Sequence, residues 1–295
     1  MSALAELALR WYRRSARDLP WRRPGVSPWG VLVSEVMLQQ TQVNRVEPVF
    51  VEWLQRWPTP SDLAREPAGE AIKAWGRLGY PRRALRLHQT ARLIVARHDG
   101  EVPADVTELE RLPGIGTYTA RAVAAFAFGQ RHPVVDTNVR RLVARACHGV
   151  AAAGGSTRVS DLAAVAALLP AEPRRAARAS AALMELGALV CTARTPECEA
   201  CPIASLCRWR SAGRPATAAG PGARRSPGYA GTDRYVRGLL LDLARRHEVV
   251  GKATALAAWA DREQAERALA GLIEDGLLVE VRHGRYALPE VVPAG

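Results

Sequence analysis

Long apolar runs and lysines are both scarce in this sequence. No stretch approaches the length that crosses a membrane, and the first residues do not form a basic and then apolar leader. Lys73 and Lys252 are the only lysines. We therefore expect a cytoplasmic protein with no membrane partner, in which lysine-dependent chemistry is restricted to two positions.

Acidic residues are too few to balance the arginines, and the formal net charge is +12. The imbalance is uneven, because residues 229–295 carry nine Arg or Lys against ten Asp or Glu. The basic excess therefore lies in the first 228 residues and indicates a polyanionic partner there. A generally arginine-rich composition would explain the choice of Arg over Lys, but it would not explain this asymmetry.

The segment Leu112-Pro-Gly-Ile-Gly116 separates two predicted helices, 106–112 and 120–129. A glycine hairpin that opens a helix leaves amide groups near Gly114 and Gly116 unpaired, where the helix dipole favours an anion such as a DNA phosphate. Asp136 follows twenty residues after Gly116, directly before a predicted helix over 137–147. Taken alone, Asp136 is best interpreted as a helix cap.

Glu35 lies inside a helix predicted to begin at Ser27-Pro28. Its neighbours are apolar on both sides, so the helix is expected to be buried. A carboxylate there is either paired or held partly protonated by desolvation. By itself the pattern favours a paired structural carboxylate over a catalyst.

These motifs together resemble those of the helix-hairpin-helix DNA glycosylases, and most closely the MutY-type adenine glycosylases, which act on adenine opposite 8-oxoguanine. The resemblance rests on the hairpin, on Val134-Val-Asp-Thr-Asn-Val139 and on Ser34-Glu-Val-Met-Leu-Gln-Gln-Thr-Gln-Val43, and it covers about residues 7–210. It implies an all-α, two-lobed core over 1–210, with a six-helix lobe at about 21–130 and an iron–sulfur lobe from 1–20 plus 131–210. The implied partner is double-stranded DNA with adenine opposite 8-oxoguanine or guanine, bound by a nucleoid-associated monomer.

Four cysteines follow the spacing C-x6-C-x2-C-x5-C: Cys191, Cys198, Cys201 and Cys207. In a reducing compartment they are expected to be metal ligands rather than disulfides. Zinc sites usually contain two separated C-x-x-C pairs, whereas one compact loop can surround a [4Fe–4S] cluster. The family resemblance implies this cluster, in a structural role.

The resemblance also implies the chemistry. Glu35 would protonate adenine at N7, Asp136 would stabilise the sugar cation, and Asn138 would orient Asp136. Tyr118 stands where bifunctional relatives carry a Schiff-base lysine, so we expect a glycosylase without lyase activity. The remaining positions implied to contact DNA are Trp21, Arg22 and Leu38 at the adenine, Gln40 and Tyr80 as intercalators, Thr41 beside them, and Gly114 and Gly116 at phosphates.

The C-terminal third departs from the family. Residues 211–228 are predicted to be a flexible linker, and 229–295 a small winged-helix-like domain with helices over 232–246, 254–259 and 265–275 and a hairpin over 277–288. MutY proteins usually carry a larger Nudix-like domain that reads 8-oxoguanine. Either the core and this small domain recognise the opposite base, or the preference for 8-oxoguanine opposite adenine is weaker. The domain could equally bind a protein or only pack on the core.

Two other functions stay open. Thymine or uracil mismatch glycosylases of the same superfamily share the hairpin Tyr, the Asp and the iron–sulfur loop, but an acid such as Glu35 favours a purine substrate. A non-catalytic DNA-damage sensor is the alternative from another class, and the presence of both carboxylates argues against it. The sequence indicates no particular protein partner.

Overall fold

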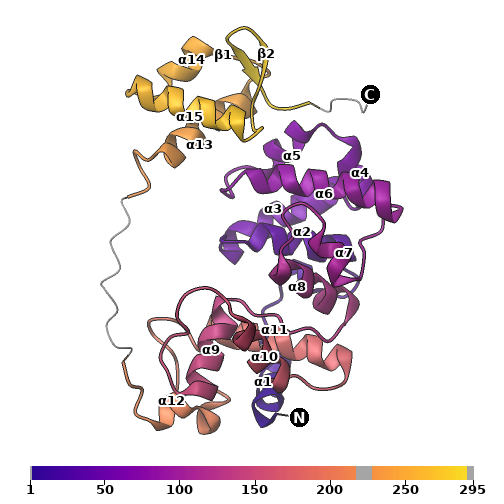
Figure 1. Cartoon of the computed structure of the whole chain (residues 1–295), viewed down its shortest axis with the longest axis vertical. Helices are drawn as coiled ribbons and strands as arrows, with labels where there is room; N and C mark the ends of the chain where they lie inside the picture. Colours follow the sequence, from indigo (N-terminus) through magenta and orange to yellow (C-terminus); the bar gives the residue numbers. More distant parts are fainter. Residues whose placement is uncertain (1, 217–227, 291–295) are drawn as a thin grey trace. The chain divides into compact units, whose positions relative to one another are not determined.

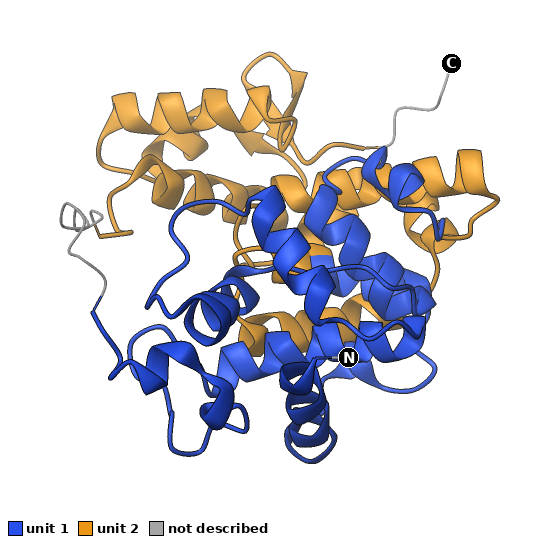
Figure 2. Cartoon of the chain, turned by 60° about the horizontal axis from the view of Figure 1, so that its bottom comes forward, with its two compact units in different colours: residues 1–35, 103–223 blue, residues 36–102, 224–295 orange. Residues whose placement is uncertain are grey.

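The structure is a computed structural model that describes residues 2–216 and 228–290, and it is mostly helical (Figure 1). The chain forms two compact units, one from residues 1–35 and 103–223 and the other from 36–102 and 224–295 (Figure 2). Each unit is described by itself. The predicted lobe and domain boundaries stay predictions, and much of the predicted linker, residues 217–227, lies outside the described residues.

The first unit is built around two helices that are far apart in the sequence, α1 (Ala3–Ser15) and α11 (Pro173–Leu189). Leu4, Leu183 and Leu186 are buried in this core, which also takes the apolar face of the helix that follows Asp136. The other helical elements of the unit are η1 (Pro20–Arg22), the first part of α2 (Pro28–Leu38), α7 (Val106–Glu110), α8 (Thr117–Phe128), α9 (Thr137–His148), α10 (Val159–Leu168), η2 (Ala204–Leu206) and α12 (Arg208–Ser211).

The helices around the predicted hairpin begin and end at residues with clear local reasons. Gly114 adopts a φ of +77°, which glycine alone reaches without strain, and turns the chain from α7 into α8. Helix α8 ends at Gly129 and α9 at Gly149, both in the left-handed conformation typical of a helix C-terminus. The helix-hairpin-helix expected from the sequence is therefore present.

The second unit contains α3 (Val43–Arg56), α4 (Pro60–Arg65), α5 (Ala68–Trp75) and α6 (Arg82–His98) around a tryptophan core. The ring of Trp53 packs edge-on against Trp57 and Trp75, with centroids 4.7 and 5.8 Å apart. Helix α4 was not predicted, because it has only six residues and begins at a local capping box between Thr59 and Asp62 rather than at an apolar repeat.

The C-terminal domain has the predicted winged-helix-like arrangement. Helices α13 (Asp233–Arg246), α14 (Lys252–Ala257) and α15 (Arg262–Glu274) precede the hairpin of β2 (Val279–Arg282) and β3 (Arg285–Ala287). A two-residue strand, β1 (Val250–Gly251), completes an antiparallel sheet of order β1-β3-β2, and it was too short to predict.

The same domain contacts residues 36–102 within this unit. The amide of Gly69 donates to the carbonyl of Pro289 at 2.6 Å, and Arg245 Nε donates to the carbonyl of Ile72 at 3.2 Å. A Cβ added to Gly69 would lie 2.9 Å from Leu288 Cβ, so glycine permits this close approach. Of the helices in the described residues, none is long and apolar enough to cross a membrane.

Candidate active site

Glu35 lies on α2, which begins as the sequence predicts. Pro28 is its first residue, and the Ser27 hydroxyl accepts the amide of Gly30 at 3.2 Å. The Glu35 side chain is surrounded by buried residues of the same helix, and only 7% of the residue is exposed. Burial raises the pKa of the Glu35 carboxyl from 4.5 to about 7, although a hydrogen bond from Tyr118 and the charge of Arg22 oppose the rise. The Glu35 carboxyl can therefore hold a proton near neutral pH.

Asp136 lies at the N-terminus of α9 and serves there as the predicted cap. Its Oδ1 accepts the amide of Val139 at 2.7 Å, and its Oδ2 accepts the side-chain amide of Asn138 at 2.7 Å. Burial raises the pKa of Asp136, while these hydrogen bonds and the charge of Arg141 act in the opposite direction. The carboxylate of Asp136 also raises the pKa of Glu35 by repulsion, so the two carboxyl groups lie close together. Its role as a cap therefore does not exclude a role in catalysis.

Tyr118 stands in the first turn of α8, directly after the hairpin. Its hydroxyl donates a hydrogen bond to the carboxyl of Glu35. Burial and the two nearby carboxylates raise the pKa of Tyr118 well above its usual value, so it stays a neutral donor. The predicted set of Glu35, Asp136 and Tyr118 is thus brought together within one unit, from three separate helices.

Arg22 belongs to the same group, and it is held by a carboxylate that sequence reasoning missed. Glu185 on α11 is fully buried, and its Oε2 lies 3.0 Å from Arg22 Nη1 and 2.7 Å from Arg17 Nη2. Arg22 Nη1 is buried but makes no hydrogen bond to the described residues, since its geometry toward Glu185 is poor. Trp21 is buried beside it in η1. The only sequence signal for Glu185 was one acidic residue within an apolar helix.

A chain of hydrogen bonds joins Asp136 to the cysteine loop. Asn138 accepts from Arg141 Nη2 at 2.8 Å, and Arg141 also donates to the carbonyls of Gly187 (2.6 Å) and Cys191 (2.7 Å). Gly187 lets α11 approach this segment, because an added Cβ would lie 2.7 Å from the carbonyl oxygen of Asn138. The orientation of Asp136 therefore depends on helix α11 and on the loop that contains the cysteines.

The hairpin leaves an exposed surface at the beginning of α8. Gly114 and Gly116 are exposed, and a Cβ added to Gly116 would meet no atom within 4 Å. Because the first amides of a helix have no partner within it, this turn presents N–H groups and the positive end of the dipole to solvent. The turn can bind a phosphate.

All four predicted cysteine ligands line one small cavity in the first unit. They are free thiols, and burial together with the three other cysteines raises the pKa of Cys201 to about 11. Holding all four as thiolates would need a positively charged group between them. In the described parts of the chain, no three His, Cys, Asp or Glu side chains converge as ligands of a single ion. Four thiols around a cavity instead fit a cluster that has a volume of its own.

Leu38, Gln40, Thr41 and Tyr80 lie in the second unit, where one arginine joins their loops. Buried Arg83 donates to the carbonyls of Gln39 (2.6 Å) and Gly79 (2.9 Å) and to the hydroxyl of Thr41 (2.8 Å). Gln40 and Tyr80 are exposed, and both adopt positive φ angles of 55° and 49°. Sequence reasoning missed Arg83, whose only signal was an arginine close behind the loop.

Comparison with known proteins agrees with these features. Residues 33–152 match the HhH-GPD superfamily of base excision DNA repair proteins, and residues 191–207 match the iron–sulfur binding domain of endonuclease III. The chain is 57% identical over 282 residues to an adenine DNA glycosylase of Mycolicibacterium smegmatis, covering 95% of this chain and 94% of the relative. It is 54% identical over 283 residues to an adenine DNA glycosylase of Mycobacterium tuberculosis, covering 95% and 92%. A solved thermostable thymine-DNA glycosylase superposes with a TM-score of 0.63 at 26% identity, covering 70% of this chain and 95% of that chain.

Proposed function

Since this chain belongs to the adenine DNA glycosylases of the HhH-GPD superfamily, we propose that it removes adenine from DNA in which adenine faces 8-oxoguanine or guanine. The single observation that carries this proposal is the buried Glu35 with a pKa of about 7. An acid of this strength donates a proton efficiently near neutral pH. A purine offers N7 as the acceptor, and protonation there makes the base a good leaving group.

Asp136 acts on the sugar side of the reaction. As the base leaves, positive charge develops at C1′, and a carboxylate held by the amide of Val139 and by Asn138 is already oriented to stabilise it. Tyr118 keeps the Glu35 carboxyl in one orientation through its hydrogen bond. Arg22, which Glu185 holds in place, brings a positive charge close to Glu35 and can donate to the extruded adenine or to the water that completes the hydrolysis.

The adenine must leave the base stack before these groups can reach it. We assign the phosphate contact to the exposed hairpin at Gly114 and Gly116, and the wedge into the duplex to Gln40 and Tyr80. Trp21 and Leu38 are proposed to contact the adenine.

The four cysteines hold the iron–sulfur cluster of the endonuclease III type. A [4Fe–4S] cluster bound by these four cysteines would offset part of the thiolate charge and hold the loop together. This chain's own residues carry that shape to Asp136 through the hydrogen bonds of Arg141 and Asn138.

We further propose that the enzyme lacks lyase activity. Tyr118 cannot form a Schiff base, and neither Lys73 nor Lys252 is in the segments that build the site. Borohydride should therefore not trap the protein efficiently on abasic product. Efficient trapping would contradict this assignment.

An excision assay tests the function. Four duplexes are compared, with A opposite 8-oxoguanine, A opposite G, T opposite G and U opposite G. We expect excision of adenine from the first two and its loss in Glu35→Gln and Asp136→Asn. Preferred removal of thymine or uracil would favour the mismatch glycosylases, a possibility raised by the structural likeness to a thymine-DNA glycosylase. Binding of all duplexes without excision would favour a sensor.

The proposed partner is double-stranded DNA, bound by one copy of the chain at the bacterial nucleoid in the cytoplasm. The high arginine content of the chain supports a polyanionic partner.

A further inference from the structure

We propose that the C-terminal domain is part of the DNA-binding surface, with Arg234 on α13 as the positioning residue that holds Tyr80 and with α13 as one wall of a groove for a DNA strand. The proposal deepens the proposed function and rests on it. It assigns a role to a domain that the excision chemistry leaves without one.

Ion pairs from α13 and from the end of α15 fix the C-terminal domain beside the loop that carries Tyr80. Arg77 Nη2 lies 2.8 Å from Asp242 Oδ2, and Asp242 also pairs with Arg245 at 2.7 Å. From the other side, Arg82 Nη1 lies 3.1 Å from Asp275 Oδ1. Exposed ion pairs are weak one by one, but these span both ends of the loop. The domain therefore contacts the loop itself and not only the body of the unit.

Arg234 contacts the aromatic side chain of Tyr80 directly. Its guanidinium carbon lies 4.1 Å from the centroid of the Tyr80 ring, and its Nη1 lies 3.1 Å from the Tyr80 hydroxyl. On the core side, the guanidinium of Arg83 lies 5.6 Å from the same ring. A tyrosine at φ +49° is in a conformation that surrounding contacts must maintain. Arg83 supplies those contacts from the core and Arg234 from the C-terminal domain.

The loop and α13 together form a groove of about 930 Å³. Its only acidic lining residues among the described residues are Asp242 and Asp275, and both already pair with arginines. The lining also includes the aromatic rings of Tyr80, Tyr229 and Tyr235. Eight arginines line it: Arg45, Arg77, Arg82, Arg83, Arg86, Arg234, Arg237 and Arg245.

Most of this arginine excess comes from residues 36–102, which contribute five arginines and no acidic residue to the lining. The C-terminal segment as a whole has one more acidic than basic residue, yet its part of the lining, three arginines and two aspartates, carries one net positive charge. Arginines track a phosphodiester backbone, and aromatic rings stack on bases, so the lining fits a single DNA strand beside the mispair.

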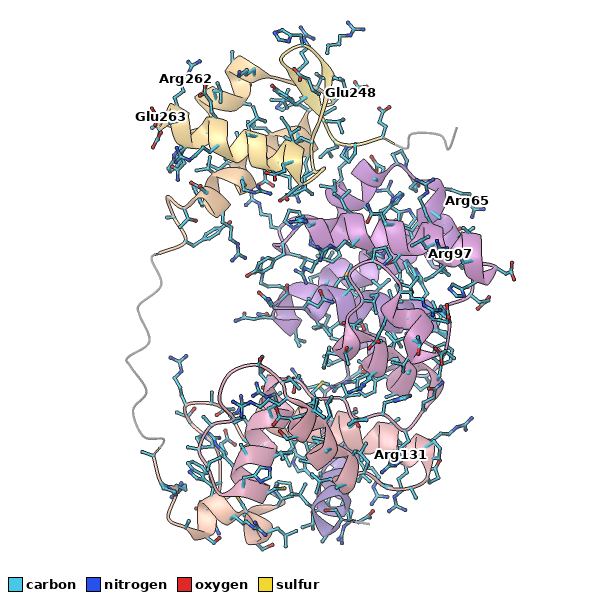
Figure 3. The ribbon with its side chains drawn as sticks, in the orientation of Figure 1. Arg65, Arg97, Arg131, Glu248, Arg262 and Glu263 are labelled. Atoms are coloured by element: carbon cyan, nitrogen blue, oxygen red, sulfur yellow. The ribbon has the colours of Figure 1, made fainter. Side chains whose placement is uncertain are left out.

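The test compares Arg234→Ala with Arg262→Ala. Arg262 lies at the N-terminus of α15, is exposed and does not line the groove (Figure 3). The probe is a duplex with a non-cleavable 2′-fluoro-deoxyadenosine opposite 8-oxoguanine, with 2-aminopurine next to it. For Arg234→Ala we expect threefold to tenfold weaker binding, a salt dependence reduced by about one phosphate contact, and a smaller fluorescence rise on base extrusion. Arg262→Ala should match the wild type in all three.

Arg234→Lys separates charge from positioning. Lysine keeps the phosphate charge but has neither the planar stacking surface nor the fork of donors. We expect it to restore the salt dependence but not the 2-aminopurine signal. A thermal melt of each holoenzyme shows whether the domain stays folded, and Arg234→Lys keeps the test decisive if Arg234→Ala is destabilised.

The outcomes distinguish the two proposals. If the wild type excises adenine but Arg234→Ala equals Arg262→Ala in affinity, salt dependence and fluorescence, the groove assignment is wrong while the proposed function holds. That same result is expected if the groove binds an acidic protein instead. If the wild type excises no base, the proposed function fails, whereas the difference in DNA affinity between the two variants still shows whether the groove binds DNA.

Discussion

Replacing Glu35 by Gln is expected to inactivate the enzyme and, at pH 8, to stabilise it. The neutral amide cannot donate the proton, so single-turnover excision should fall by about 10²- to 10⁴-fold. The stability effect has a separate origin, because the folded protein holds Glu35 in an environment that disfavours its charged form.

The magnitude follows from the difference between the ordinary glutamate pKa of 4.5 and the value of about 7 in the folded protein. Because folding raises the pKa of Glu35, this residue does not destabilise the protein below pH 4.5. Its destabilising effect grows as the pH rises from 4.5 to 7 and is complete above pH 7. The cost of ionised Glu35 is about 3 kcal/mol at pH 8 and under about 1 kcal/mol at pH 5. Glu35→Gln removes it.

The assay is thermal unfolding of the cluster-loaded protein at pH 8 and pH 5. At pH 8 the variant should melt roughly 6 to 12 °C above the wild type, and at pH 5 most of this difference should disappear. Glu185→Gln is the matched control, because Glu185 is equally buried but pairs with Arg17 and Arg22, which lower its pKa. Its neutralisation should destabilise the protein. A Glu35→Gln protein that is no more stable than wild type at pH 8, or equally stabilised at both pH values, would refute the reasoning.

Three further predictions address the surroundings of the site. Asp136→Asn should lower excision by orders of magnitude without lowering stability, since asparagine also caps helices and removes a charge that folding disfavours, and single-turnover rates with a thermal melt will check this. Gly187→Ala should slow excision at unchanged DNA affinity, because the new Cβ would displace Asn138. Gly155→Ala is the control and should have no effect, since no atom lies within 4 Å of its added Cβ. Equal excision rates for the two variants would contradict the proposed contact between Gly187 and Asn138. Cys201→Ser should abolish the absorption of the iron–sulfur cluster and weaken DNA binding, whereas retention of a full cluster would show that Cys201 is not a ligand.

Local and periodic features of the sequence predicted much of the site. The hairpin at Gly114 and Gly116, the cap at Asp136 and the start of α2 at Pro28 are each specified by neighbouring residues. The spacing of the cysteines likewise places them on one loop. These features depend on backbone conformations that a few adjacent side chains determine, so they can be read without knowledge of packing.

By itself the sequence determined which residues we propose to carry the chemistry, because short segments contain their types and their spacing. Only the tertiary structure decided whether these residues are buried and protonated and which other side chains hold them in place. Arg17 and Glu185 are separated by 168 residues, and Arg234 and Tyr80 by 154, so no local pattern links them. Burial depends on every element packed around a side chain, which is why Glu35 could be predicted as either a paired carboxylate or a proton donor until its surroundings were known. For the same reason, packing alone placed a nearly neutral C-terminal domain on the loop of Tyr80 with three of its eight arginines in one groove.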